Sequence, residues 1–320
     1  MKTIETVLFM TLIMMSGRGV TAQSSVVRKN PALDAIVAEN AEVKKAADGF
    51  QFTEGPVWSP QGFLLFSDIP ANRIYQWTPE QGASLFMENS GGSNGLAFDH
   101  MGNLLACQHT ARQIGRMTQD KKFETVTGDW GGKKFNSPND LAIKSDGSVY
   151  FTDPAYGLPL GASDPAKEIR FQGVFRYANG KTELLDSTLD NPNGIAFSPD
   201  EKYLYAANYD NDTKAKQWVV YKVEKNGGIS KRKVFADATA SLEKGGPDGM
   251  KVDLAGNVFC AGPGGVQIYS PKGELLGWIR IPEVVANLCF GGKDGKTLFV
   301  TARTGLYTVQ LNTPAIIIHK

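Results

Sequence analysis

The stretch Pro247-Asp248-Gly249-Met250-Lys251-Val252 is the clearest copy of a pattern that recurs along this chain: a polar or acidic residue, a small residue and a short apolar run. The residues that open the copies are Glu54, Asn94, Asn139, Asn193, Asp248 and, in a weaker match, Asn287. Successive copies begin roughly 40 to 55 residues apart, and internal repeats of this length are typical of propeller blades.

A second apolar run follows each opening after a turn, as in Gly147–Phe151 and Gly256–Cys260. Short β runs joined by Gly-rich turns predict an all-β fold, a six-bladed β-propeller over residues 41–312. The sixth unit has room for only three strands. We therefore expect a strand near Glu42–Ala46 to pair with Leu306–Gln310 and close the ring.

The N-terminus carries Lys2, an apolar run over Val7–Met15 and the small-residue sequence Val20-Thr21-Ala22. This pattern predicts a signal peptide over residues 1–22 and an exported, periplasmic or secreted protein. The apolar run is short for a permanent anchor, so an uncleaved anchor is the alternative interpretation. We interpret residues 23–40 as a leader and residues 313–320 as a C-terminal tail.

The composition argues against some classes of binding partner. The net charge is +1 and the charged fraction is 21%, which gives no electrostatic footprint for nucleic acid or for an anionic membrane. The three cysteines lie in apolar runs and are expected to be buried thiols without a disulfide framework. We expect a small-molecule substrate, no membrane contact in the mature form, and a monomer or weak dimer.

The six opening residues are candidates for a metal site. The first strand of each blade lines the central channel of a propeller, so these residues should form a ring at one mouth of the channel. Two carboxylates and four amides offer oxygen donors, which favours one Ca²⁺, with Mg²⁺, Mn²⁺ or Zn²⁺ as substitutes. The alternative is that Asn and Asp before Gly are ordinary turn residues.

Several motifs carry a resemblance to a known family. They are Glu54-Gly55-Pro56, Pro138-Asn139-Asp140, Asn193-Gly194, Pro247-Asp248-Gly249-Met250 and Cys289-Phe290-Gly291-Gly292. In this order, over roughly residues 40–311, the chain resembles the senescence marker protein / gluconolactonase / luciferin-regenerating enzyme-like family of calcium-dependent lactonases. The resemblance implies that the metal is held by Glu54, Asn139, Asn193 and Asp248, and that Asp248 is the acid/base. Ser137 replaces an arginine of the animal members, so their substrate contacts are not transferred.

The expected reaction is hydrolysis of a sugar lactone, in which the metal polarises the carbonyl and a base activates water. His109 is an alternative base to Asp248, because an imidazole titrates near neutral pH. Expected substrate contacts are Asn94, Asp153, Tyr156 and Asn287, with Tyr156–Ile169 as a candidate lid. A metal-dependent phosphotriesterase or another esterase is the alternative function. A non-catalytic scaffold is disfavoured, because a scaffold does not need two carboxylates in one channel mouth.

Overall fold

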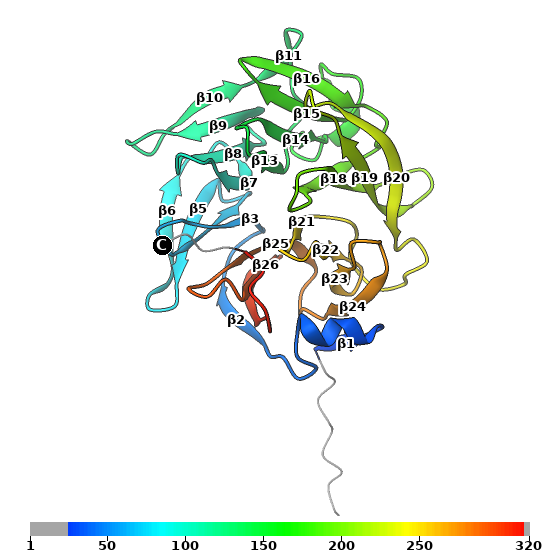
Figure 1. The fold of residues 1–320 in the computed structure, drawn as a ribbon. Helices are drawn as coiled ribbons and strands as arrows, with labels where there is room; N and C mark the ends of the chain where they lie inside the picture. Colours follow the sequence, from blue (N-terminus) through cyan, green and yellow to red (C-terminus); the bar gives the residue numbers. More distant parts are fainter. Residues whose placement is uncertain (1–24, 317–320) are drawn as a thin grey trace, which may run out of the picture.

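The structure, a computed structural model, describes residues 25–316. Within that range the chain forms six antiparallel blades around a central axis (Figure 1), which confirms the predicted six-bladed β-propeller. The helices in this range are the 3₁₀ helices η1 (Pro31–Ala35) and η2 (Gly161–Ser163), and no helix there is long and apolar enough to cross a membrane. The expected signal peptide lies outside the described residues.

The first four blades each contain four strands in sequence order. Blade one is β3 (Thr53–Trp58), β4 (Leu64–Asp68), β5 (Arg73–Thr78) and β6 (Gly82–Glu88). Blade two is β7 (Ser93–Phe98), β8 (Leu104–Gln108), β9 (Gln113–Met117) and β10 (Phe123–Thr127), followed by the hairpin β11 (Asp129–Trp130) and β12 (Lys133–Lys134). Blade three is β13 (Leu141–Ile143), β14 (Val149–Asp153), β15 (Gly173–Ala178) and β16 (Lys181–Asp186), and blade four is β17 (Pro192–Phe197), β18 (Tyr203–Tyr209), β19 (Lys216–Val223) and β20 (Ile229–Asp237).

The last two blades also contain N-terminal strands. Blade five is β21 (Met250–Val252), β22 (Val258–Gly262), β23 (Gly265–Tyr269) and β24 (Leu275–Ile279), with β1 (Val26–Arg28) paired to β24. Blade six is β25 (Val285–Gly291), β26 (Thr297–Ala302), β27 (Gly305–Gln310) and, outermost, β2 (Val43–Asp48). The pairing of β2 with β27 runs from Val43 opposite Val309 to Asp48 opposite Gly305. Both ends of the domain therefore share one sheet.

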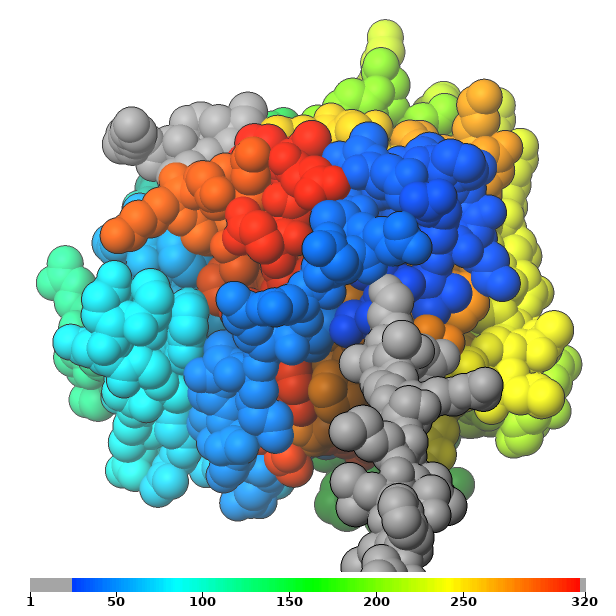
Figure 2. Space-filling model, turned by 90° about the horizontal axis from the view of Figure 1, so that it is seen from below, coloured from blue at the N-terminus to red at the C-terminus, as the bar shows by residue number. Residues whose placement is uncertain are grey.

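Residues 25–40 are packed into the domain. Leu33 and Val37 are fully buried in the apolar cluster between blades five and six. The side chain of Asn30 caps η1 by accepting a hydrogen bond from the backbone N–H of Ala32 at 2.9 Å. Figure 2 shows this N-terminal segment, in blue, lying beside the red C-terminal strands. The segment interpreted as a leader thus contributes a strand, a 3₁₀ turn and core side chains.

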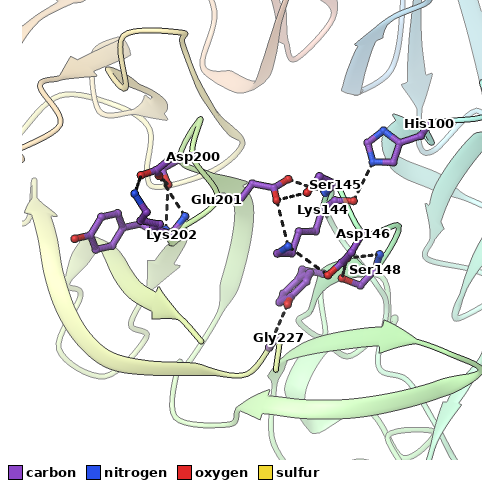
Figure 3. Close-up of polar contacts among 12 residues, drawn as sticks. His100, Lys144, Ser145, Asp146, Ser148, Asp200, Glu201, Lys202 and Gly227 are labelled. Atoms are coloured by element: carbon purple, nitrogen blue, oxygen red, sulfur yellow. Dashed lines mark hydrogen bonds and ion pairs between the residues drawn. The ribbon is translucent and has the colours of Figure 1, made fainter. Parts of the chain in front are cut away.

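The turns after the innermost strands are joined by polar contacts between blades (Figure 3). Glu201, before β18, accepts a hydrogen bond from the backbone N–H of Ser145 at 2.6 Å and pairs with the Lys144 ammonium at 3.2 Å. A ring nitrogen of His100, from blade two, lies 3.0 Å from the Lys144 carbonyl. Blades two, three and four are therefore connected at the end of the channel opposite to the predicted ring.

The three cysteines are buried in the sheets. Cys107, Cys260 and Cys289 are free thiols with buried side chains. This confirms that they serve as small core residues, as expected from the apolar runs around them.

Candidate active site and metal centre

The ring residues lie where the innermost strands converge. Gly95 donates a backbone hydrogen bond to the carbonyl of Asn139 at 2.9 Å, and Gly249 donates one to the carbonyl of Ala286 at 2.8 Å. Neighbouring blades are therefore in direct backbone contact at the channel. This close approach brings side chains from all blades to one mouth.

The glycines that follow the ring residues are required by this close approach. A Cβ atom on Gly249 would lie 2.0 Å from Cγ of Asn287, and one on Gly55 would lie 1.8 Å from the carbonyl oxygen of Asn94. Both distances are far below van der Waals contact. Glycine is therefore required at these two positions to admit the neighbouring blade.

The ring opens into a cavity of about 760 Å³. Of the predicted site residues, seven line it: Glu54, Asn94, His109, Asn139, Tyr156, Asn193 and Asp248. The structure therefore brings together the four expected metal ligands, both candidate bases and two of the expected substrate contacts. A cavity of this size is typical of a small-molecule site.

Asp153 and Asn287 lie beneath the cavity lining. The Asp153 carboxylate is fully buried and accepts hydrogen bonds from the backbone N–H groups of Asn136 and Ser137, both at 2.8 Å. It thereby fixes the loop that presents Asn139. The Asn287 amide donates to Glu54 Oε2 at 3.0 Å. In this structure both residues position other site residues.

The candidate lid is anchored between blades two and three. Ile169 is buried in the apolar cluster between blades two and three, and Leu158 is also buried. Within Tyr156–Ile169, Tyr156 is the residue that lines the cavity, with 48% of its surface exposed. Burial and the charge of Asp248 raise the pKa of the Tyr156 phenol, so it enters the site as a neutral hydroxyl.

Two charged residues under the ring were not assigned a role from the sequence. The Asp140 carboxylate is almost fully buried and lies 3.4 Å from the Asn287 amide nitrogen and 3.7 Å from the Lys251 ammonium. Asp140 directly follows Asn139, and Lys251 interrupts the apolar run after Asp248. A lone cation in such a run was the signal available in the sequence.

Burial and mutual repulsion dominate the electrostatics of the site. Burial raises the pKa of Glu54 to about 7, and the charge of Asp140 acts in the same direction. Burial and the charges of Glu54 and Asp140 raise the pKa of Asp248 well above its usual range. These carboxylates therefore favour a nearby cation, because ionised groups in a low dielectric need a counter-charge.

The side-chain amide oxygens of the ring also favour a nearby cation. The Oδ1 atoms of Asn139 and Asn94 are buried and have no hydrogen-bond partner within the described residues. Leaving such an acceptor unsatisfied costs about 1 to 3 kcal/mol, and a hard cation would satisfy it. Across residues 25–316 no three His, Cys, Asp or Glu side chains are grouped so that they could hold a metal ion. A cation at the ring would therefore need amide oxygens, such as that of Asn139, in addition to carboxylates.

His109 is buried beside the ring. Its Nε2 atom lies 3.1 Å from the Asn94 amide nitrogen. Burial lowers the pKa of His109 to about 4. The imidazole is neutral at pH 7, and its Nε2 is hydrogen-bonded to Asn94.

Other cavity residues come from strand ends and loops outside the ring. Phe52, Tyr209, Lys244 and Arg303 line the rim, and the Arg303 guanidinium lies over the Phe52 ring at 5.2 Å. None of them opens a repeated unit. Sequence periodicity therefore could not identify them.

The fold and this ring of oxygen donors define a six-bladed propeller with a small-molecule site at the mouth of its channel. The family model described as "SMP-30/Gluconolactonase/LRE-like region" matches residues 52–304. The chain belongs to this family, which confirms the resemblance seen in its motifs.

Known relatives match over most of the chain. A gluconolactonase of Zymomonas mobilis is 38% identical over 306 residues, covering 89% of this chain and 85% of that protein. The pentonolactonase XacC of Haloferax volcanii is 29% identical, covering 79% and 81%. A solved gluconolactonase structure from Xanthomonas campestris superposes with a TM-score of 0.81 at 29% identity, covering 91% and 96%.

Proposed function

We propose that this protein hydrolyses the ester bond of a sugar lactone and that the reaction depends on one divalent cation, Ca²⁺. The observation that carries the proposal is the convergence of the Glu54 and Asp248 carboxylates with the Asn139 oxygen, which has no hydrogen-bond partner within residues 25–316, at one small-molecule cavity. The similarity to a gluconolactonase and a pentonolactonase supports a sugar lactone as the substrate class.

The cation would be held by Glu54, Asn139, Asn193 and Asp248, whose donors are all oxygen atoms. This donor set favours Ca²⁺, with Mg²⁺, Mn²⁺ or Zn²⁺ as substitutes. When bound, the cation supplies Lewis-acid polarisation of the lactone carbonyl. Asn287 orients Glu54 through its amide hydrogen bond, and Asp153 fixes the backbone before Asn139.

Asp248 is the group that we assign to proton transfer. Its carboxylate lines the cavity beside the expected ligands and can take a proton from the attacking water with an oxygen that the cation leaves free. His109 is less suited to act as base, because its Nε2 is hydrogen-bonded to Asn94 and burial lowers its pKa to about 4. In this proposal His109 orients Asn94, and Asn94 and Tyr156 bind substrate hydroxyls.

The test is turnover of a panel of aldonolactones before and after chelation, with Ca²⁺ added back. Chelation should abolish turnover and Ca²⁺ should restore it. General-base assistance typically contributes about 10²- to 10⁴-fold, so Asp248→Asn should lower kcat by that factor at saturating Ca²⁺, while His109→Gln should lower it less. Asp200→Asn, in a turn between β17 and β18 (Figure 3), is the matched carboxylate control.

Two outcomes would contradict this assignment. Full turnover in the chelated protein would exclude a required cation. A loss of kcat in His109→Gln that exceeds the loss in metal-saturated Asp248→Asn would transfer the role of base to His109. A phosphotriester in the same panel tests the alternative function, since faster turnover of that ester would reverse the substrate assignment.

We also propose that the protein is exported and that residues 1–22 are removed. The basis is the N-terminal pattern of a basic residue, an apolar run and a small-residue cleavage sequence. Intact mass of the protein recovered from the periplasm or the medium should correspond to a chain that begins at Gln23. Recovery of the full-length chain from the membrane fraction would indicate an uncleaved anchor.

A further inference from the structure

We infer that Lys251 is a fixed counter-charge that matches the ring to a divalent cation. The inference rests on the cation site proposed above. It concerns the ion pair of Lys251 with Asp140, which lies beneath the expected ligands and has no assigned role in the reaction.

A chain of contacts links this ion pair to the ring. The Lys251 ammonium lies 3.7 Å from Asp140 Oδ2, and the Asn287 amide nitrogen lies 3.4 Å from that oxygen and 3.0 Å from Glu54 Oε2. Lys251 comes from blade five, Asp140 from the start of blade three, Asn287 from blade six and Glu54 from blade one. Four blades therefore meet through these contacts at the channel axis.

The summed charge of the linked side chains favours a divalent cation at the ring. Glu54, Asp140 and Asp248 contribute three negative charges when ionised, and Lys251 contributes one positive charge. The net charge of −2 equals that of one divalent cation in magnitude. The Asp140 side chain is 1% exposed and the Lys251 side chain 27% exposed, so their charges are screened far less than surface charges.

The other cationic side chains near the cavity are more exposed to solvent than Lys251. Lys244 and Arg303 line the rim and are exposed. Solvent and salt screen them from the floor of the cavity. Lys251 is therefore the cation whose removal should change the field at the ring most strongly.

The experiment measures binding of Ca²⁺ and of the trivalent probe Tb³⁺ to chelated protein by calorimetry. Lys251→Met should tighten Ca²⁺ binding about tenfold, because a repelling charge is lost. Tb³⁺ binding should tighten more, about thirtyfold, because the repulsion scales with the charge of the bound ion. Lys251→Arg should keep both affinities near those of the parent protein. Lys244→Met, at the exposed rim, is the matched control and should change either affinity less than about threefold.

A second variant keeps the test decisive if Lys251→Met folds poorly. Asp140→Asn alone should weaken Ca²⁺ binding about tenfold, since it removes an attracting charge. Asp140→Asn combined with Lys251→Met removes one charge of each sign and should restore both affinities. Thermal unfolding at saturating Ca²⁺ establishes that each variant is folded.

The inference is overturned if folded Lys251→Met binds Ca²⁺ with unchanged or lower affinity, or if the Ca²⁺ and Tb³⁺ affinities change by the same factor. Either result would make Lys251 a packing residue. Absence of Ca²⁺ binding to the parent protein would instead overturn the cation site of the proposed function. The two failures are therefore distinguishable.

Discussion

Replacing His109 with glutamine should make the protein less sensitive to acid. His109 is only 7% exposed, and burial lowers its pKa to about 4 from the value of 6.5 for a free imidazole. Between these pH values the unfolded chain binds a proton that the folded chain does not. The free energy of unfolding therefore falls as pH decreases through 6.5 towards 4, and this part of the fall requires the imidazole.

The size of the effect follows from the two pKa values. They differ by about 2.5, and each pKa unit corresponds to about 1.4 kcal/mol. The full loss is therefore about 3 kcal/mol, approached near pH 4, and about 2 kcal/mol is already lost at pH 5. A loss of that size is a substantial fraction of the stability of a typical domain.

The assay is urea unfolding of parent and variant between about pH 8 and pH 5, at fixed Ca²⁺ concentration and ionic strength. Glutamine keeps a hydrogen-bonding group near Asn94. Any loss of packing lowers the free energy of unfolding of the variant by the same amount at every pH and does not change its pH dependence. The stability difference between parent and variant should change by about 2 kcal/mol across the range, in favour of the variant at low pH. His100→Gln removes an exposed imidazole at an inter-blade contact (Figure 3) and is the matched control. A difference that stays constant with pH would refute the reasoning.

Three further substitutions test the packing around the site and the N-terminal segment. Gly249→Ala should weaken Ca²⁺ binding and lower Tm, because the added Cβ would lie 2.0 Å from Cγ of Asn287; an unchanged affinity in calorimetry would contradict this. Leu33→Ala should cost about 2 to 5 kcal/mol in urea unfolding, because the side chain is fully buried, and an unchanged midpoint would show that the segment is dispensable. Asp153→Asn should weaken Ca²⁺ binding by releasing the backbone before Asn139, which comparison of calorimetry with Tm can separate from general destabilisation.

The regular part of the fold could be predicted because each blade repeats the same constraint. A first strand must begin with a residue that reaches the channel, continue with apolar residues and end in a turn. The opening residues therefore recur at blade intervals. The same logic predicted that a strand near Glu42–Ala46 would pair with Leu306–Gln310, and the structure pairs Val43–Asp48 with Gly305–Gln310.

The rest of the site consists of side chains from different blades that meet in space, and the spacing of the sequence repeats does not predict which of them meet. Asp140 and Lys251 come from different blades, and the sequence shows only that Asp140 directly follows a ring residue and that Lys251 interrupts an apolar run. Asp153 was expected to contact substrate because it ends a second strand, but its carboxylate is occupied by two backbone N–H groups. The three-residue strand Val26–Arg28 was missed for a similar reason, since so short a strand has no periodic pattern and pairs with the distant β24.

The innermost strands contact their neighbours differently at their two ends, and the geometry of the ring depends on the contacts at both ends. At the ring end the strands touch through backbone and glycine, so a small change in the tilt of one blade would move its donor. At the opposite end Glu201 binds Ser145 and Lys144 across the boundary between blades three and four (Figure 3). The Lys144 and Glu201 side chains are 19% and 24% exposed, so solvent screens this ion pair only in part. These contacts restrain the relative tilt of blades three and four, because they hold the far ends of the two innermost strands together. Asn139 and Asn193 are presented at the other ends of these blades, so the same restraint limits their relative movement.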